Sequence, residues 1–244
     1  MITTNDWPRL SQQLIDALAL TASPIGISFS SPPPGSVPAF DEPMSPPTAD
    51  GRSGRVAASC VFWIAAADHA FTTVPADHGN CSVGRVVHGL AGLEDVAHLS
   101  DVATLVGSGW VSETAVGATP TVARTTGMIT YGPLGAMPLD PEVVLLRIDG
   151  RQLMLLSDAV PGLRVEGKPQ CQIIAIAKEA GEAAVSVGCS VSRVRTGMGP
   201  EEMTCAIPAH RLREVVAAVC RVAAIDTTVA EYAVADARRF ATTA

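Results

Sequence analysis

CSVGRVVHGL at residues 81–90 and CSVSRVRTGM at residues 189–198 are two versions of one short segment. They share Cys-Ser-Val-x-Arg-Val and a glycine eight positions after the cysteine. Their surroundings match as well. Each follows a strand-like stretch, which itself follows an apolar helix-like stretch that opens with a cysteine, Cys60 or Cys171. The sequence therefore predicts that a strand, a cysteine-bearing helix, a strand and a Cys-Ser-Val segment occur twice.

Outward from these segments, strand-like and helix-like patterns alternate along the chain. PEVVLLRID at residues 141–149 is a β-branched apolar run typical of a strand, and HRLREVVAAVCRVAAI at residues 210–225 has the periodicity of an amphipathic helix. Residues 31–55, rich in Pro, Ser and Gly, predict an irregular loop. The alternation favours an α/β fold with a mixed or parallel sheet. We expect a single domain, 1–244, with an internal duplication whose pseudo-repeats span residues 24–90 and 141–198.

Composition limits the classes of partner. The chain has 244 residues, of which 17 are Lys or Arg and 24 are Asp or Glu, so its net charge is −7. This balance argues against a nucleic-acid partner, which rewards clustered basic residues. No basic run suits an anionic membrane surface, and no stretch reaches the roughly 18 apolar residues of a membrane span. The apolar C-terminal helix and the modest charge permit a homodimer.

The chain opens without a secretory signal pattern, which indicates a reducing compartment. In such a compartment the six cysteines are not interpreted as a disulfide framework. We therefore expect a cytoplasmic protein. Cys205, within a strand-like run, and Cys220, on a helix face, are interpreted as core residues. The other four occupy equivalent positions of the two units. If the units pack about a pseudo-twofold axis, by analogy with symmetric dimers, these four can meet at one point: Cys60, Cys81, Cys171 and Cys189.

Four thiolates at one point suit a soft metal ion or an iron–sulfur cluster. The closely spaced cysteine pairs of structural zinc sites are absent, so widely spaced single cysteines favour a buried cluster or a catalytic site. Several polar residues beside the cysteines could bind a small anionic substrate or tune the metal. These candidates are Arg85, Arg193, Ser82, Ser190 and His78.

Three functions stay open on the residues alone. The first is a metal or iron–sulfur protein, with redox or lyase-type chemistry on a small anionic substrate if it is an enzyme. The second is a metal-free thiol enzyme with Cys81 or Cys189 as the nucleophile. The third is a non-enzymatic protein that binds a small molecule or a partner and uses its cysteines only for packing. The sequence does not decide whether the protein is an enzyme.

The chain also resembles the domain of unknown function 169 family, an uncharacterised conserved region of archaea and bacteria. The resemblance covers residues 15–220 and rests on PIGISF, HGNCSVG and GCSVSRVRTGMGPEEMTCAIP, together with Cys60 and Cys171. Family members frequently carry Pro-Gly-Gly after the cysteine that matches Cys81, where this chain has Ser-Val-Gly. The resemblance implies no activity, because that of the family is unknown.

Overall fold

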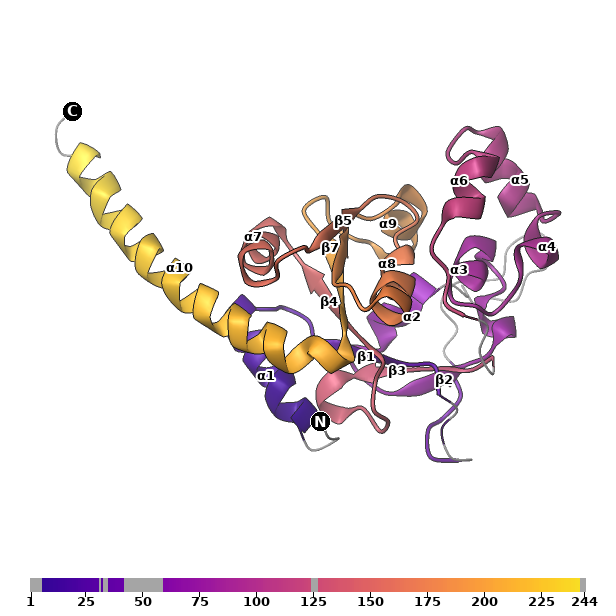
Figure 1. Cartoon of the computed structure of the whole chain (residues 1–244), viewed down its shortest axis with the longest axis horizontal. Helices are drawn as coiled ribbons and strands as arrows, with labels where there is room; N and C mark the ends of the chain where they lie inside the picture. The colour runs from indigo at the N-terminus through magenta and orange to yellow at the C-terminus, as the bar shows by residue number, and fades with distance from the viewer. Residues whose placement is uncertain (1–5, 31, 33–34, 42–58, 124–126, 242–244) are drawn as a thin grey trace.

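The computed structural model describes residues 6–241 of the chain, apart from residues 31, 33–34, 42–58 and 124–126. The described residues form a seven-stranded sheet with helices on both faces (Figure 1). Most of the loop predicted over residues 31–55 lies outside the described residues. The strands are β1 (Ile25–Ser28), β2 (Phe71–Thr73), β3 (Ile129–Pro133), β4 (Val143–Ile148), β5 (Arg164–Glu166), β6 (Ala184–Ser186) and β7 (Met203–Pro208).

The helices confirm several of the predicted elements. The α-helices are α1 (Trp7–Leu18), α2 (Ser59–Ala65), α3 (Ser82–Val87), α4 (Leu93–Val96), α5 (Ser100–Gly107), α6 (Glu113–Ala118), α7 (Gly150–Ala159), α8 (Gln172–Ala175), α9 (Ser190–Thr196) and α10 (Leu212–Ala241). Shorter 3-10 turns are η2 (Pro75–His78), η3 (Leu134–Ala136) and η5 (Ala209–Arg211), and η4 (Ile176–Ala180) is a π-helix that continues α8. The C-terminal helix predicted over residues 210–225 is present but runs much further, to Ala241.

The sheet is mixed, which is one of the two forms that the sequence predicts. Its strand order is β2-β3-β1-β4-β7-β6-β5. Among the strand pairs of the described sheet, only β5 and β6, at one edge, run parallel. At the centre, β1 and β4 run antiparallel, with Gly26 opposite Val144. Outward from this central pair the order is the same on both sides, first β3 or β7 and then β2 or β6.

The order of elements along the chain is also alike in the two halves. The first half runs β1, α2, β2, α3 and β3, with α4 to α6 added after α3, and the second runs β4, α8, β6, α9 and β7, with α7 and β5 added after β4. Cys60 lies in the first turn of α2, and Cys171 directly precedes α8. The duplication itself remains a prediction, but the likeness places matching cysteine-bearing elements on either side of the β1–β4 pair.

Two apolar cores lie on opposite faces of the sheet, because successive side chains of a strand point to opposite faces. On β4, Val143 and Leu145 join the core beneath α2 and α8, whereas Val144 and Leu146 join the core beneath α1, α7 and α10. Figure 1 shows α1 alongside the inner part of α10, which then extends away from the sheet. The α2 and α8 face therefore carries the candidate cysteines.

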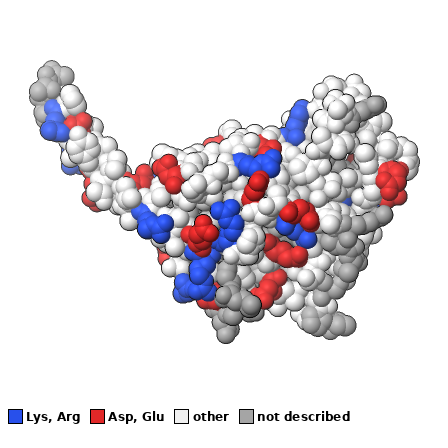
Figure 2. Space-filling model, in the orientation of Figure 1, with Lys and Arg blue, Asp and Glu red and all other residues white. Residues whose placement is uncertain are grey.

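Helices α3 to α6 form a lobe beside that face, at the right of Figure 1. α3 contacts both α4 and α5. Figure 2 shows acidic and basic side chains interspersed over the central part of the visible face, whereas the surface over α5 and α6 carries few charges. Within the part of the chain that the structure describes, no helix has the length and apolar character needed to cross a membrane.

Candidate functional site

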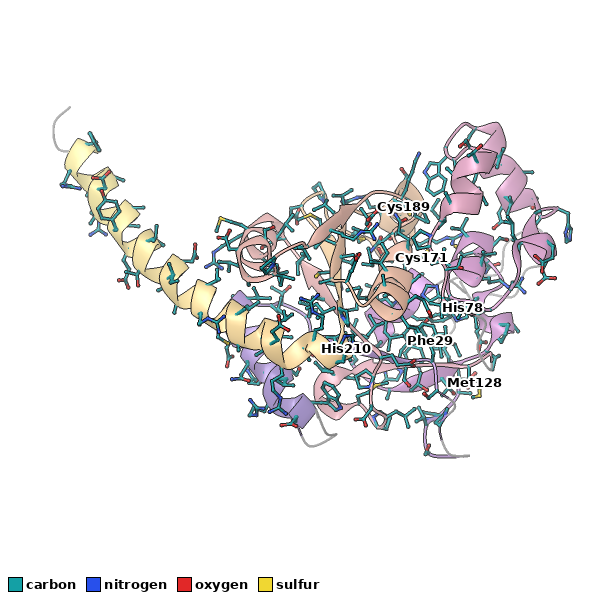
Figure 3. All side chains as sticks on the ribbon, in the orientation of Figure 1. Phe29, His78, Met128, Cys171, Cys189 and His210 are labelled. Atoms are coloured by element: carbon teal, nitrogen blue, oxygen red, sulfur yellow. The ribbon has the colours of Figure 1, made fainter. Side chains whose placement is uncertain are left out.

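The four cysteines predicted to act together line a single pocket, although 129 positions separate the first from the last. Cys60 comes from α2 and Cys171 from the start of α8, while Cys81 and Cys189 immediately precede α3 and α9. Figure 3 labels Cys171 and Cys189, which lie between the central sheet and the α3–α6 lobe. The pocket is completed by Val83, Gly84, Leu105, Trp110, Pro169, Gln170, Val191, Ser192 and Arg195.

The repeated Cys-Ser-Val segment has the same local structure in both copies. Cys81 and Cys189 are the N-cap residues of their helices, in extended backbone conformation. Each sulfur accepts a hydrogen bond from the backbone N–H three residues later, from Gly84 or from Ser192, with a nitrogen–sulfur distance of 3.4 Å in each case. An N-cap side chain satisfies a helix N–H that lacks an intrahelical partner. The segment therefore fixes each sulfur at the start of its helix.

Burial controls the protonation of these thiols. Burial, together with a smaller contribution from thiolate charge at Cys81, raises the pKa of Cys60 to about 12. Burial raises the pKa of Cys171 well above its usual value, and thiolate charge at Cys81, Cys60 and Cys189 adds to the effect. Burial also raises the pKa of Cys81. The pKa of Cys171 thus responds to charge on each of the other three cysteines, which is expected only of neighbours at one site.

Arg195 supplies positive charge to this cluster of thiols. Its charge lowers the pKa of Cys81 and of Cys60, which partly opposes burial. Its Nη2 donates to the backbone carbonyl of Asn80, with a nitrogen–oxygen distance of 2.8 Å, and so joins α9 to the loop before Cys81. Its Nη1 is buried and has no hydrogen-bond partner among the described residues. The repeated segment singles out Arg193, yet it is Arg195 that lines the pocket.

Ser192 and Gln170 form a polar link under the pocket that sequence reasoning also missed. The Ser192 hydroxyl donates to the Gln170 amide oxygen, and the Gln170 amide nitrogen donates to the Thr204 hydroxyl, with a nitrogen–oxygen distance of 2.9 Å. Hydrogen bonding from Ser192 also lowers the pKa of Cys60. This chain of hydrogen bonds connects α9, the loop before α8, and β7. It holds the second-half elements together around the cysteines.

The two arginines predicted to bind a substrate lie elsewhere. Arg193 donates to the backbone carbonyls of Gly199, Val187 and Glu202, so it ties α9 to the loops on either side. The charge of Arg85, on α3, contributes to lowering the pKa of His78. Neither arginine is among the described residues that line the cysteine pocket.

The other polar candidates are likewise outside the pocket lining that the structure describes. Ser82 is buried, and both its N–H and its hydroxyl donate to the Asp101 carboxylate, at 3.0 and 2.8 Å. Ser190 is exposed. His78 is fully buried, with its Nε2 2.9 Å from the Thr73 hydroxyl oxygen and its ring packed against Phe62. Burial lowers the pKa of His78 well below its usual value.

Cys205 and Cys220 belong to the opposite core. Cys205 is fully buried on β7, and Cys220 packs against the same core from α10. All six cysteines of the chain are free thiols. Across the described residues, no group of three or more His, Cys, Asp or Glu side chains is arranged to hold a metal ion.

Comparison with known proteins adds a family but no activity. No curated protein and no solved structure matches the chain. The family described as uncharacterised ArCR, the domain of unknown function 169, matches residues 13–218, which include the sheet, the α3–α6 lobe and all four pocket cysteines. This match confirms the resemblance noted in the sequence, and the chain belongs to the domain of unknown function 169 family.

Proposed function

We propose that this protein binds an iron–sulfur cluster through Cys60, Cys81, Cys171 and Cys189. The observation that carries the proposal is that these four cysteines, selected from the repeated sequence pattern, line one pocket. Four thiolates are the usual ligands of [2Fe–2S] and [4Fe–4S] clusters. The two other cysteines of the chain, which lie on the far side of the sheet, provide an internal contrast.

A cluster fits the pocket better than a single ion does. In a [4Fe–4S] cluster each thiolate binds a different iron, so the four sulfurs need not converge to the distances of a tetrahedral zinc site. The centre of a water molecule can occupy about 50 Å³ of the pocket, whereas about 10–15 Å³ is enough to hold one water. The pocket therefore has room for a group of several atoms.

At Cys81 the electrostatics support metal binding over metal-free nucleophilic catalysis. A nucleophilic cysteine needs a lowered pKa, because the thiolate is the reactive form. Burial instead raises the pKa of Cys81, one of the two candidate nucleophiles. A metal replaces the thiol protons as it binds, so neutral buried thiols are compatible with a metal site. Arg195 then offsets part of the negative charge that four thiolates bring to the pocket.

The cluster would give the protein redox or Lewis-acid chemistry on a small molecule, and a lyase-type reaction belongs to the second kind.

We also propose that the two halves arose by duplication, which the matching N-cap geometry and strand order support. Six free thiols support the expected cytoplasmic location. The homodimer that the sequence permits would bury the exposed apolar side chains of the outer part of α10, among them Ile225, Val229 and Tyr232.

The decisive experiment is purification without oxygen, followed by measurement of iron, acid-labile sulfide and visible absorption. We expect iron and sulfide in the wild-type protein. Cys→Ala changes at Cys60, Cys81, Cys171 and Cys189 should each remove most of both. Cys205→Ala and Cys220→Ala are the matched controls and should retain them. A colourless wild-type protein without iron, or equal iron in all six variants, would contradict the proposal.

Two neighbouring arginines provide a second contrast. Arg195→Gln removes a positive charge that faces the thiols, so it should make the reduction potential of the cluster more negative. Arg193→Gln removes hydrogen bonds to three backbone carbonyls and should lower the free energy of unfolding by about 1.5–3 kcal/mol while changing the potential less. Protein-film voltammetry and urea unfolding measure the two effects. Equal reduction potentials in the two variants would show that the charge of Arg195 does not act on the cluster.

A further inference from the structure

A second, almost wholly apolar pocket adjoins the cysteine pocket. The two share Val83, Leu105, Trp110 and Pro169 as lining residues. From these shared residues the second pocket continues into the α3–α6 lobe, where it is lined mostly by valine and leucine side chains. We call this second pocket the apolar chamber. Because the two pockets share these four lining residues, the chamber lies directly beside the cysteine pocket.

The chamber has little to offer a polar or charged group. No charged side chain is among its described lining residues, and Ser82 and Thr119 are its only hydroxyl-bearing ones. The hydroxyls of both already donate hydrogen bonds, that of Ser82 to Asp101 at 2.8 Å and that of Thr119 to the Ala115 carbonyl at 2.9 Å. A cavity without polar partners holds water poorly and binds apolar molecules instead. The lining therefore selects an uncharged hydrocarbon group.

We propose that the apolar chamber receives the short hydrocarbon tail of the small molecule on which the cysteine site acts, with the polar end of that molecule facing the cysteines. This inference rests on the proposed function, since it assigns the substrate class of the same site. It refines the small anionic substrate expected from the sequence: the charge, if there is one, lies at the end away from the chamber.

The size of the chamber sets the length of the tail. The centre of a water molecule can occupy about 40 Å³ of it, against about 10–15 Å³ for a single water, which corresponds to about three or four small groups in a row or a branched cluster. Trp110 forms part of the wall between the two pockets, and the Lys168 ammonium lies over its ring, with 4.8 Å between the nitrogen and the ring centroid. A butyl or isobutyl group matches this space.

Binding of simple alcohols tests the chamber. Butan-1-ol and butane-1,4-diol have the same chain length, but the diol buries a second hydroxyl without a partner. We expect butan-1-ol to bind at least about tenfold more tightly than the diol, given the cost of burying an unpaired hydroxyl. Ligand-observed NMR titration measures both affinities, on the wild-type protein prepared without oxygen and on the same protein after iron removal.

Two variants locate the binding in the chamber. Val116→Phe adds bulk to a wall residue that does not line the cysteine pocket, and it should abolish butan-1-ol binding. Val194→Phe on the exposed surface of α9, where the side chain is 86% exposed, is the matched control and should bind as wild type does. If Val116→Phe fails to fold, Val96→Ala enlarges the chamber instead and should shift the preference from butan-1-ol toward hexan-1-ol.

The outcomes separate this inference from the proposed function. If the wild type contains iron and sulfide but does not bind butan-1-ol selectively, the proposed role of the chamber is contradicted and the proposed cluster is kept. Butan-1-ol binding that Val116→Phe or Val96→Ala leaves unchanged would also overturn the chamber. Selective binding by a wild-type protein that already lacks iron when purified without oxygen would support the chamber and contradict the cluster.

Discussion

The protonation of the pocket cysteines follows from how deeply each thiol is placed. Cys60, with a pKa of about 12 in the fold, stays neutral over the whole physiological range, and Cys171 does so as well. If the proposed cluster binds at neutral pH, these two thiols must therefore release their protons to solvent.

Burial of Cys60 also predicts how the stability of the metal-free protein depends on pH. Below pH 9, its unperturbed pKa, the thiol is protonated in both states and its contribution to stability is fully present. Between pH 9 and about 12 only the unfolded chain loses the proton, so the free energy of unfolding falls as pH rises, by up to about 1.4 kcal/mol per pH unit for one thiol. Urea unfolding of the iron-free protein between those pH values measures this slope.

The comparison that isolates the thiol is the same titration on Cys60→Ala. Other groups titrate in this range in both proteins, so only the difference between the two slopes reports on Cys60. We expect a shallower fall in the variant. Identical slopes would mean that the Cys60 thiol is as accessible to solvent in the fold as in the unfolded chain.

At the scale of elements, the position of Cys81 depends on how α3 is held by α5. Asp101, in the first turn of α5, accepts hydrogen bonds from the N–H and the hydroxyl of Ser82, the first residue of α3. Ser82 is buried, so these two donors cannot turn to water if the carboxylate is removed. The α3–α5 contact thus orients the helix whose N-cap is the Cys81 sulfur.

We therefore predict that Asp101→Ala lowers the free energy of unfolding by about 1–3 kcal/mol and loosens α3. Hydrogen exchange of the backbone amides of residues 82–87 should speed up, and iron should pass more quickly to a chelator. Asp226→Ala is the control, because its carboxylate pairs with Arg151 at the surface, where such a pair contributes about 0–1 kcal/mol. Equal exchange rates in wild type and Asp101→Ala would show that α3 is held by its apolar contacts alone.

The elements also explain which parts of the fold the sequence could predict. β4 was predictable because it is buried on both faces and reads as a continuous apolar run. The repeated segment pointed to both N-cap cysteines because their local hydrogen bonds depend on nearby residues only. β5 was not predicted, since this three-residue edge strand is largely exposed and carries no apolar pattern. α4 and α6, at four and six residues, are too short to show a helical periodicity.

The cysteines of the site could be predicted, but most of their surroundings could not. Trp110, Gln170 and Arg195 come from a loop after α5, a loop before α8 and the end of α9, and only the packing of the lobe against the sheet brings them to one pocket. The choice between Arg193 and Arg195 illustrates the limit. The repeat marked Arg193 because Arg85 matches it, yet Arg193 bonds to nearby backbone carbonyls, and it is Arg195 that makes the contact distant in sequence, with the Asn80 carbonyl.

At the scale of the whole molecule, α10 joins a buried inner part to an exposed outer part. Leu212, Val215 and Val219 are buried against the core shared with α1 and α7. No described residue of α10 after Val219 is buried, and the family match ends at residue 218. The contribution of α10 to the stability of the body therefore comes chiefly from its inner part, up to the partly buried Cys220 and Val222.

We predict that a chain ending at Ala224 keeps its fold and its iron, with a free energy of unfolding within about 1 kcal/mol of the full chain, since the shortening chiefly removes the surface ion pair between Arg151 and Asp226. Leu212→Ala, in the buried part, should instead cost about 2–5 kcal/mol. Urea unfolding compares the two. Light scattering on the same samples also tests the homodimer, because the shortened chain lacks the exposed apolar side chains that such a dimer would bury. A shortened chain that unfolds or loses its iron would show that the outer part of α10 packs on the body in solution, and the division of the helix into two parts would then be wrong.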